Sequence, residues 1–91
     1  MALFVATAHV HENPQMKYED LRNFHNRLDN GINRWTKRNE ELVSGFVVVD
    51  ISITSIGNPF LLVTASYRSS APTEFSLQES INRALYEDDE I

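Results

Sequence analysis

Apolar and polar positions alternate along residues 46–68 in a way that predicts a β-hairpin and its register. Every second residue is apolar from 47 to 53 and again from 61 to 67, and Gly57-Asn58-Pro59 separates the two runs. A two-residue turn would mix apolar and polar side chains on each face, whereas a three-residue loop over 57–59 keeps the faces separate. The expected cross-strand pairs are therefore Ile53 with Val63, Ile51 with Ala65, and Val49 with Tyr67.

A strand and a long helix are expected before this hairpin. Residues 3–10 alternate in the same way and predict a strand. Asn13-Pro14 is typical of a helix start, because asparagine caps free backbone N–H groups and proline needs no partner at the first helical position. Apolar residues then recur every three or four positions from Tyr18 to Trp35, which predicts one helix over about residues 15–38. Gly31 is expected to weaken or bend it, at a cost of about 1 kcal/mol relative to alanine.

The last segment predicts a shorter helix followed by an acidic tail. Ser76 and Glu79 have the spacing of a capping box, in which each side chain satisfies a backbone N–H group. An apolar stripe follows them, made of Leu77, Ile81, Ala84 and Leu85. The four acidic residues from 87 to 90 oppose the negative end of the helix dipole, so we expect residues 87–91 to be a frayed tail.

These elements predict an α+β fold of order β-α-β-β-α, in which residues 1–86 form a single domain. The strand over 60–68 is the most apolar of the three, which favours a central place in a three-stranded antiparallel sheet. The long helix is expected on one face of this sheet, and the short C-terminal helix completes the fold. The face under the long helix should carry Val49, Ile51, Ile53, Val63 and Tyr67.

The opposite face of the sheet is also rich in apolar residues, namely Leu3, Val5, Phe46, Val48, Phe60 and Leu62. A sheet face in contact with water normally carries polar side chains, and an exposed apolar patch usually marks an interface. Either the C-terminal helix or a second copy of the chain must cover it. We expect a homo-oligomer formed through these six residues.

Composition narrows the class of protein. The chain has 91 residues, a net charge of −5 and no cysteine. A core of this size is thin, so oligomerisation is a common supplement. The acidic balance argues against binding to duplex nucleic acid or to membrane surfaces, which attract basic proteins. Residues 1–10 lack the basic start of a signal peptide, and no apolar run approaches the roughly 20 residues of a membrane span. We expect a cytoplasmic protein.

Two histidines are the candidate metal ligands. His9 and His11 are two positions apart on one strand and point the same way, as a metal pair on a sheet requires. The sequence has no third ligand at a spacing typical of metal sites. We therefore expect two solvated histidines and neither a metal nor a cofactor. The sequence also has no Gly-x-Ser-x-Gly motif and no glycine-rich phosphate loop. We therefore expect no enzymatic activity.

A basic cluster at the end of the long helix is the candidate ligand site: Arg34, Trp35, Lys37 and Arg38. The helix dipole favours cations there, so a solvated basic face is one interpretation. In the other, the cations surround an anionic ligand, because arginine recognises phosphate with two parallel hydrogen bonds. Trp35 would then supply a stacking surface.

Three stretches resemble a family of very short β-α-β-β proteins from Firmicutes and their phages, known as small sporulation proteins. The first is the helix end at Asn33-Arg34-Trp35, and the other two are the strands over 48–53 and 60–67. The resemblance covers about residues 21–68 and does not extend to the loop over 39–44 or to the C-terminal helix. It implies the fold and a bacterial or phage source, and it implies no activity and no site residues.

The function that these features favour is that of a non-enzymatic binding protein. It captures a small anionic ligand, such as a nucleotide signal of the kind that phage proteins sequester, with Arg34, Trp35, Lys37 and Arg38. The alternative is an acidic inhibitor or adaptor that mimics nucleic acid, with residues 87–90 against a basic protein surface. Its partners would then be itself and a basic host protein.

Overall fold

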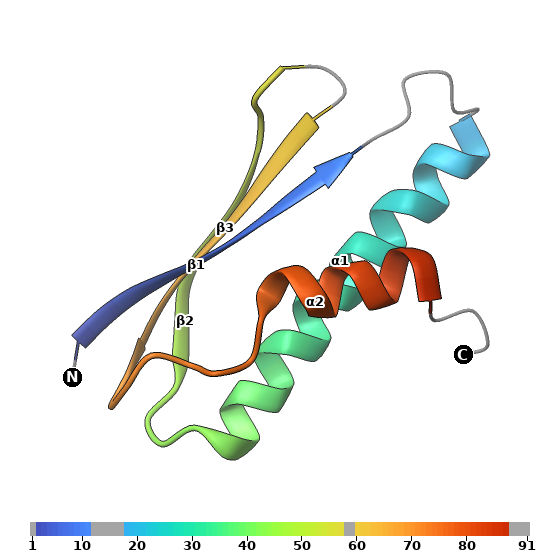
Figure 1. Ribbon diagram of the computed structural model, residues 1–91. Helices are drawn as coiled ribbons and strands as arrows, with labels where there is room; N and C mark the ends of the chain where they lie inside the picture. Colours follow the sequence, from blue (N-terminus) through green and yellow to red (C-terminus); the bar gives the residue numbers. More distant parts are fainter. Residues whose placement is uncertain (1, 12–17, 58–59, 88–91) are drawn as a thin grey trace.

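The computed structural model describes residues 2–11, 18–57 and 60–87 (Figure 1). Its elements are β1 (Ala2–His11), α1 (Tyr18–Leu42), β2 (Val47–Ser55), β3 (Phe60–Ser69), α2 (Leu77–Asn82) and a final π-helical segment, η1 (Arg83–Glu87). This sequence of elements confirms the expected β-α-β-β-α order. The proposed helix start at Asn13-Pro14 and most of the acidic tail lie outside the described residues.

The sheet has the order β1-β3-β2 with antiparallel neighbours, so the expected central strand is confirmed. Ile53 pairs with Val63 and Ile51 pairs with Ala65, as the alternation predicts. The predicted pair of Val49 with Tyr67 is wrong, because a β-bulge between Val48 and Asp50 leaves Val49 as an extra residue. A β-bulge inserts one extra residue into a strand, so the side chains before it point to the opposite face from the one that simple alternation predicts. Val48, not Val49, therefore lies opposite Tyr67.

The core lies between one face of the sheet and the apolar stripe of α1. Phe24, Leu28, Ile32 and Trp35 are buried against Val63, Ala65 and Tyr67. Phe46 completes an aromatic cluster, with its ring centroid 5.5 Å from that of Trp35 and 4.8 Å from that of Tyr67. Full burial of one such side chain contributes about 1.5–3 kcal/mol to stability, so this cluster fixes the end of α1 on the sheet.

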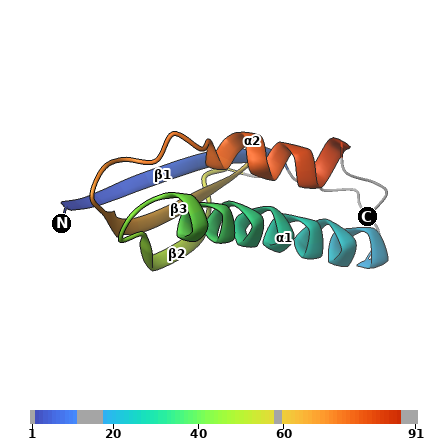
Figure 2. The same cartoon turned by 90° about the horizontal axis from the view of Figure 1, so that it is seen from below.

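The second helix packs beside α1 and over β1, on the same side of the sheet (Figure 2). It buries Leu77 and Ile81 in the common core, so it does not cover the opposite face. A Cβ atom at Gly31 would lie 3.0 Å from the Cα atom of Ile81, which is closer than packed side chains allow. α1 continues through Gly31, where glycine serves the close approach of the two helices.

β2 lies outside the helix layer. The expectation that α1 covers the inner face of this strand is wrong, because Ile51 is 38% and Ile53 is 42% exposed. Figure 1 shows the physical reason, since the end of the β2–β3 hairpin diverges from α1. With α2 beside it over β1, the helix layer is centred on β1 and β3 and leaves β2 open.

Candidate functional site

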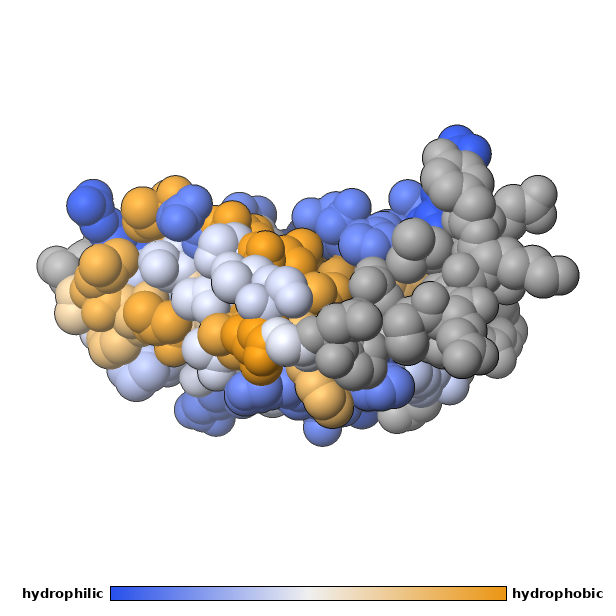
Figure 3. All heavy atoms as spheres, turned by 90° about the horizontal axis from the view of Figure 1, so that it is seen from above, coloured by the Kyte–Doolittle hydropathy of each residue, from blue (hydrophilic) through white to orange (hydrophobic). Residues whose placement is uncertain are grey.

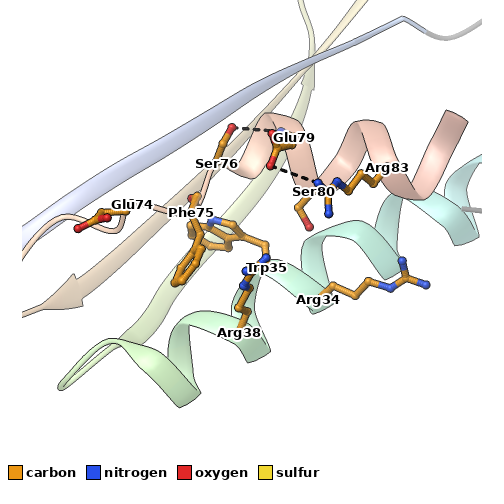
Figure 4. A pocket seen from close by; sticks show the side chains of 9 residues that line it. All are labelled: Arg34, Trp35, Arg38, Glu74, Phe75, Ser76, Glu79, Ser80 and Arg83. Carbon is orange, nitrogen blue, oxygen red and sulfur yellow. Dashed lines mark hydrogen bonds and ion pairs between the residues drawn. The ribbon is translucent and has the colours of Figure 1, made fainter. Parts of the chain in front are cut away.

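A pocket of about 420 Å³ opens between α1 and the segment that carries α2 (Figure 4). We call it the α1–α2 pocket. Its lining consists of three arginines, two glutamates, two serines and two aromatic residues: Arg34, Arg38, Arg83, Glu74, Glu79, Ser76, Ser80, Trp35 and Phe75. The charged side chains give the lining a net charge of +1 in a protein whose net charge is −5.

Two contacts across the pocket fix its aromatic wall. The indole N–H of Trp35 donates a hydrogen bond to the carbonyl oxygen of Phe75 over 2.8 Å. The guanidinium carbon of Arg38 lies 4.4 Å from the centre of the Phe75 ring, which is cation–π geometry. Arg38 is therefore held beside the opening of the pocket by the same residue that closes one side of it.

A buried hydrogen-bond network holds the segment before α2. Asn39 is fully buried, and its Nδ2 donates to the carbonyl oxygen of Trp35 over 2.8 Å. The hydroxyl of Thr73 donates to Asn39 Oδ1, and the Thr73 backbone N–H donates to the Tyr67 hydroxyl over 2.9 Å. The N–H of Phe75 donates to the Thr73 hydroxyl. Satisfied buried networks rigidify their surroundings, so Phe75 is positioned before any ligand arrives.

The α2 side of the pocket contains a capped helix start and an exposed ion pair. Ser76 is the N-cap of α2, and its Oγ accepts from the Glu79 backbone N–H over 3.1 Å, as the capping-box spacing predicts. The Glu79 carboxylate lies 4.0 Å from a guanidinium nitrogen of Arg83, and both side chains are more than half exposed. Such a pair contributes little to stability, so Arg83 can change partners at small cost.

The structure places three of the four predicted ligand residues at this pocket. Arg34 and Arg38 line it, whereas Lys37 does not. Trp35 lines it too, but its residue surface is only 2% exposed, because the ring packs on Phe46 and Tyr67. The predicted stacking role of Trp35 is therefore wrong. Its indole supports the wall and offers no face to a ligand.

Arg83 is the site residue that the sequence pattern misses. It stands 45 or more positions after the basic cluster of α1, and only the docking of α2 on α1 brings it to Arg34 and Arg38. The sequence contains one local signal, the spacing of four residues between Glu79 and Arg83, and that spacing is common on helix surfaces.

Four of the six residues of the predicted interface lie on the outer face of the sheet, and two do not. On the outer face, Leu3, Val5 and Phe60 are exposed and Leu62 is half-buried. Figure 3 shows orange apolar patches on the surface, among pale residues of intermediate hydropathy. The predicted placement of Phe46 and Val48 on this face is wrong. Phe46 is buried in the aromatic cluster, and Val48 packs against the core. The bulge after Val48 is the reason, because it turns this part of the chain towards the helices.

The two histidines occupy the end of β1. His9 and His11 are exposed, and the His11 ring packs edge-on against Phe60 with a centroid distance of 5.3 Å. Within residues 2–11, 18–57 and 60–87, no three histidine, aspartate or glutamate side chains are grouped so that they could hold a metal ion.

The chain matches no protein-family model, no curated protein and no solved structure. The resemblance to small sporulation proteins therefore stays a prediction. Among the helices of the described residues, none has the length and apolar character needed to cross a membrane. The geometry of the α1–α2 pocket and of the sheet is thus the basis for any proposal about function.

Proposed function

We propose that this protein is a non-enzymatic binding protein that captures a small anionic, nucleotide-like ligand in the α1–α2 pocket. The observation that carries the proposal is the presence of Arg34, Arg38 and Arg83 around one pocket, from two helical segments distant in sequence. Arginine is suited to this role because its planar guanidinium makes paired hydrogen bonds to phosphate oxygens.

The neighbouring side chains favour an anion that also has an apolar part. Phosphate oxygens can replace Glu79 as the partner of Arg83, since the existing ion pair is exposed and weak. Phe75 offers a half-buried ring in the wall, already engaged on one side by Arg38. A base or another flat group would extend this stack, which inorganic phosphate alone would not do.

Titration calorimetry with nucleoside monophosphates and triphosphates, and with inorganic phosphate for comparison, tests the proposal. Arg38→Gln should weaken nucleotide binding about tenfold or more, because a hydrogen bond to a charged group contributes about 1.5–3 kcal/mol. Lys37→Gln is the matched control, since it removes the same charge from the same helix but outside the pocket. We expect it to change the dissociation constant by about twofold or less.

Three results would decide against this site. If the parent protein binds none of the nucleotides, the proposed class of ligand is wrong. Equal weakening by Arg38→Gln and Lys37→Gln indicates diffuse electrostatic attraction without a pocket. Retention of the protein on an immobilised basic protein, lost on deletion of residues 87–91, favours the alternative of an acidic inhibitor or adaptor.

The binding protein is also proposed to self-associate through its outer sheet face, now defined by Leu3, Val5, Phe60 and Leu62. Phe60→Asp would place a charge in this contact, where an unpaired charge is costly. We expect the sedimentation coefficient to fall because the outer-face contact is lost, whereas Leu42→Asp, on an exposed residue at the end of α1, should leave it unchanged. A sedimentation coefficient that Phe60→Asp does not change would exclude the outer face as a contact.

A further inference from the structure

The two edges of the sheet differ in how their backbone groups are satisfied. On β1, the side-chain amide of Gln78 covers the edge at His9: its Oε1 accepts from the His9 N–H over 2.7 Å, and its Nε2 donates to the His9 carbonyl over 2.8 Å. No described side chain makes such bonds to β2. Natural proteins normally protect such an edge with charges, proline, β-bulges or a covering element. The bulge between Val48 and Asp50 lies at the start of β2, so residues 51–55 are the part of this edge that stays regular and open.

β2 combines open backbone groups with exposed apolar side chains. The Ile56 N–H donates to the Phe60 carbonyl over 3.1 Å, so the N–H of every second residue before it also points to β3. By the alternation of an antiparallel ladder, the N–H and C=O groups of Ile51, Ile53 and Ser55 point to the open edge. Asp50 is the single ionisable residue of the strand.

We propose that β2 pairs in antiparallel fashion with β2 of a second copy of the chain, around a two-fold axis at Ser52. Two three-stranded sheets then join into one sheet of six strands. The pairing sets Ile51 opposite the partner's Ile53, and it sets Asp50 opposite the partner's Thr54. Every backbone group that the open edge presents between Ile51 and Ile53 gains a partner.

The occupant is a second copy because the strand complements itself in this register. With the axis at Ser52, isoleucines of the two copies lie opposite each other on the helix side of the sheet. On the outer side, a hydroxyl or carboxylate group of one copy lies opposite a hydroxyl group of the other. An axis at Asp50 would oppose two carboxylates, which destabilises a cross-strand pair. An axis at Ile53 would set Ile51 against Ser55 and Asp50 against Ile56. Of these three axes, the one at Ser52 is the one that matches apolar and polar positions. An axis at Ile51 would match them too, but it would set Val49, the extra residue of the bulge, opposite Ile53 and so interrupt the ladder.

The same pairing accounts for the incomplete cover of the inner face. Ile51 and Ile53 are more than a third exposed in the single chain, although they share a face with the core residues Val63 and Ala65. The partner's two isoleucines would pack beside them and continue the apolar layer of the sheet. This contact is independent of the α1–α2 pocket and of the outer face.

Cysteine cross-linking tests the register, because the chain has no cysteine of its own. Residues on the axis form a non-hydrogen-bonded pair with a Cα–Cα distance of about 4.5 Å, which is within the range of a disulfide. Ser52→Cys should therefore yield a covalent dimer under mild oxidation. Thr54→Cys is the matched control, since its two copies would lie about 14 Å apart along the strands. Both positions are exposed in the single chain.

Ile53→Pro tests the contact itself, because it removes an N–H group that points to the open edge and leaves the ladder to β3 intact. The measurement is made on Phe60→Asp, which lacks the proposed outer-face contact. We expect Phe60→Asp to be a dimer by sedimentation equilibrium, and Phe60→Asp with Ile53→Pro to be a monomer that circular dichroism shows to be folded. A parent protein that stays monomeric at roughly millimolar concentration, the range of weak association, overturns the proposal. So does equal cross-linking by Ser52→Cys and Thr54→Cys, or a dimer that Phe60→Asp disrupts and Ile53→Pro does not.

Discussion

The two edge strands of this sheet show how differently one small domain can treat equivalent positions. β1 has α2 packed over it and the Gln78 amide bonded to its edge, whereas β2 has neither a covering helix nor a described side chain on its edge. Both strands pair with the same central strand, and both carry apolar residues on both faces. The difference therefore arises from where the helices pack and not from the strands themselves.

The cover on β1 depends on the crossing of α1 and α2. Gly31 lets α2 approach α1 closely, the Ser80 hydroxyl donates to the Gly31 carbonyl over 2.8 Å, and the fully buried Ile81 fills the crossing. Gln78 is on the same helix, one turn before Ile81, so its position on β1 follows from this crossing. The protection of one edge is thus coupled to the core.

Removing the Ile81 side chain should have the largest effect on this arrangement. Ile81→Ala leaves a cavity at the helix crossing, and such changes cost about 2–5 kcal/mol of unfolding free energy. Chemical denaturation gives the loss of unfolding free energy. Relative to the parent protein, hydrogen exchange should be accelerated more at the β1 amides than at the β3 amides. Val49→Ala, at an exposed residue of β2, is the control and should cost about 1 kcal/mol or less. Equal losses would mean that α2 does not hold the protected side.

Gln78→Ala should make β1 resemble β2 without disturbing the core. It removes two hydrogen bonds to His9, each of which contributes about 0.5–1.5 kcal/mol to stability. The exchange rate of the His9 N–H should rise about fivefold or more, which corresponds to about 1 kcal/mol. Asn82→Ala removes the helical partner of Gln78 and should leave the His9 exchange rate nearly unchanged. An unchanged rate in Gln78→Ala would show that α2 shields His9 by steric cover alone.

The part of the fold that local patterns determine was predictable from the sequence, and the part that depends on docking was not. The loop length fixed the pairs Ile53–Val63 and Ile51–Ala65, because apolar residues alternate there. The bulge was missed because Val47, Val48 and Val49 are all apolar, so no alternation marks the extra residue. The order of the strands followed from the composition of the central one.

The candidate site divides in the same way. Arg34 and Arg38 are recognisable as neighbours on one helix face, since four positions separate them. Arg83 joins them only through the crossing of α1 and α2, and Gln78 reaches His9 across 69 positions. Neither relation leaves a periodic signal in the chain, because each depends on where a short helix packs.

Asp50→Asn should have the smallest effect, and it distinguishes the possible registers of a β2–β2 contact. With the axis at Ser52, the two Asp50 carboxylates lie about 14 Å apart, which exceeds the screening length of about 8 Å at physiological salt. Their unscreened repulsion in water is about 0.3 kcal/mol, so the dimer dissociation constant should change by less than about twofold. With the axis at Asp50, the carboxylates would face each other directly, and Asp50→Asn would tighten the dimer strongly at low salt. Sedimentation equilibrium of both proteins at two salt concentrations separates these cases, because only direct opposition of the carboxylates makes the difference large.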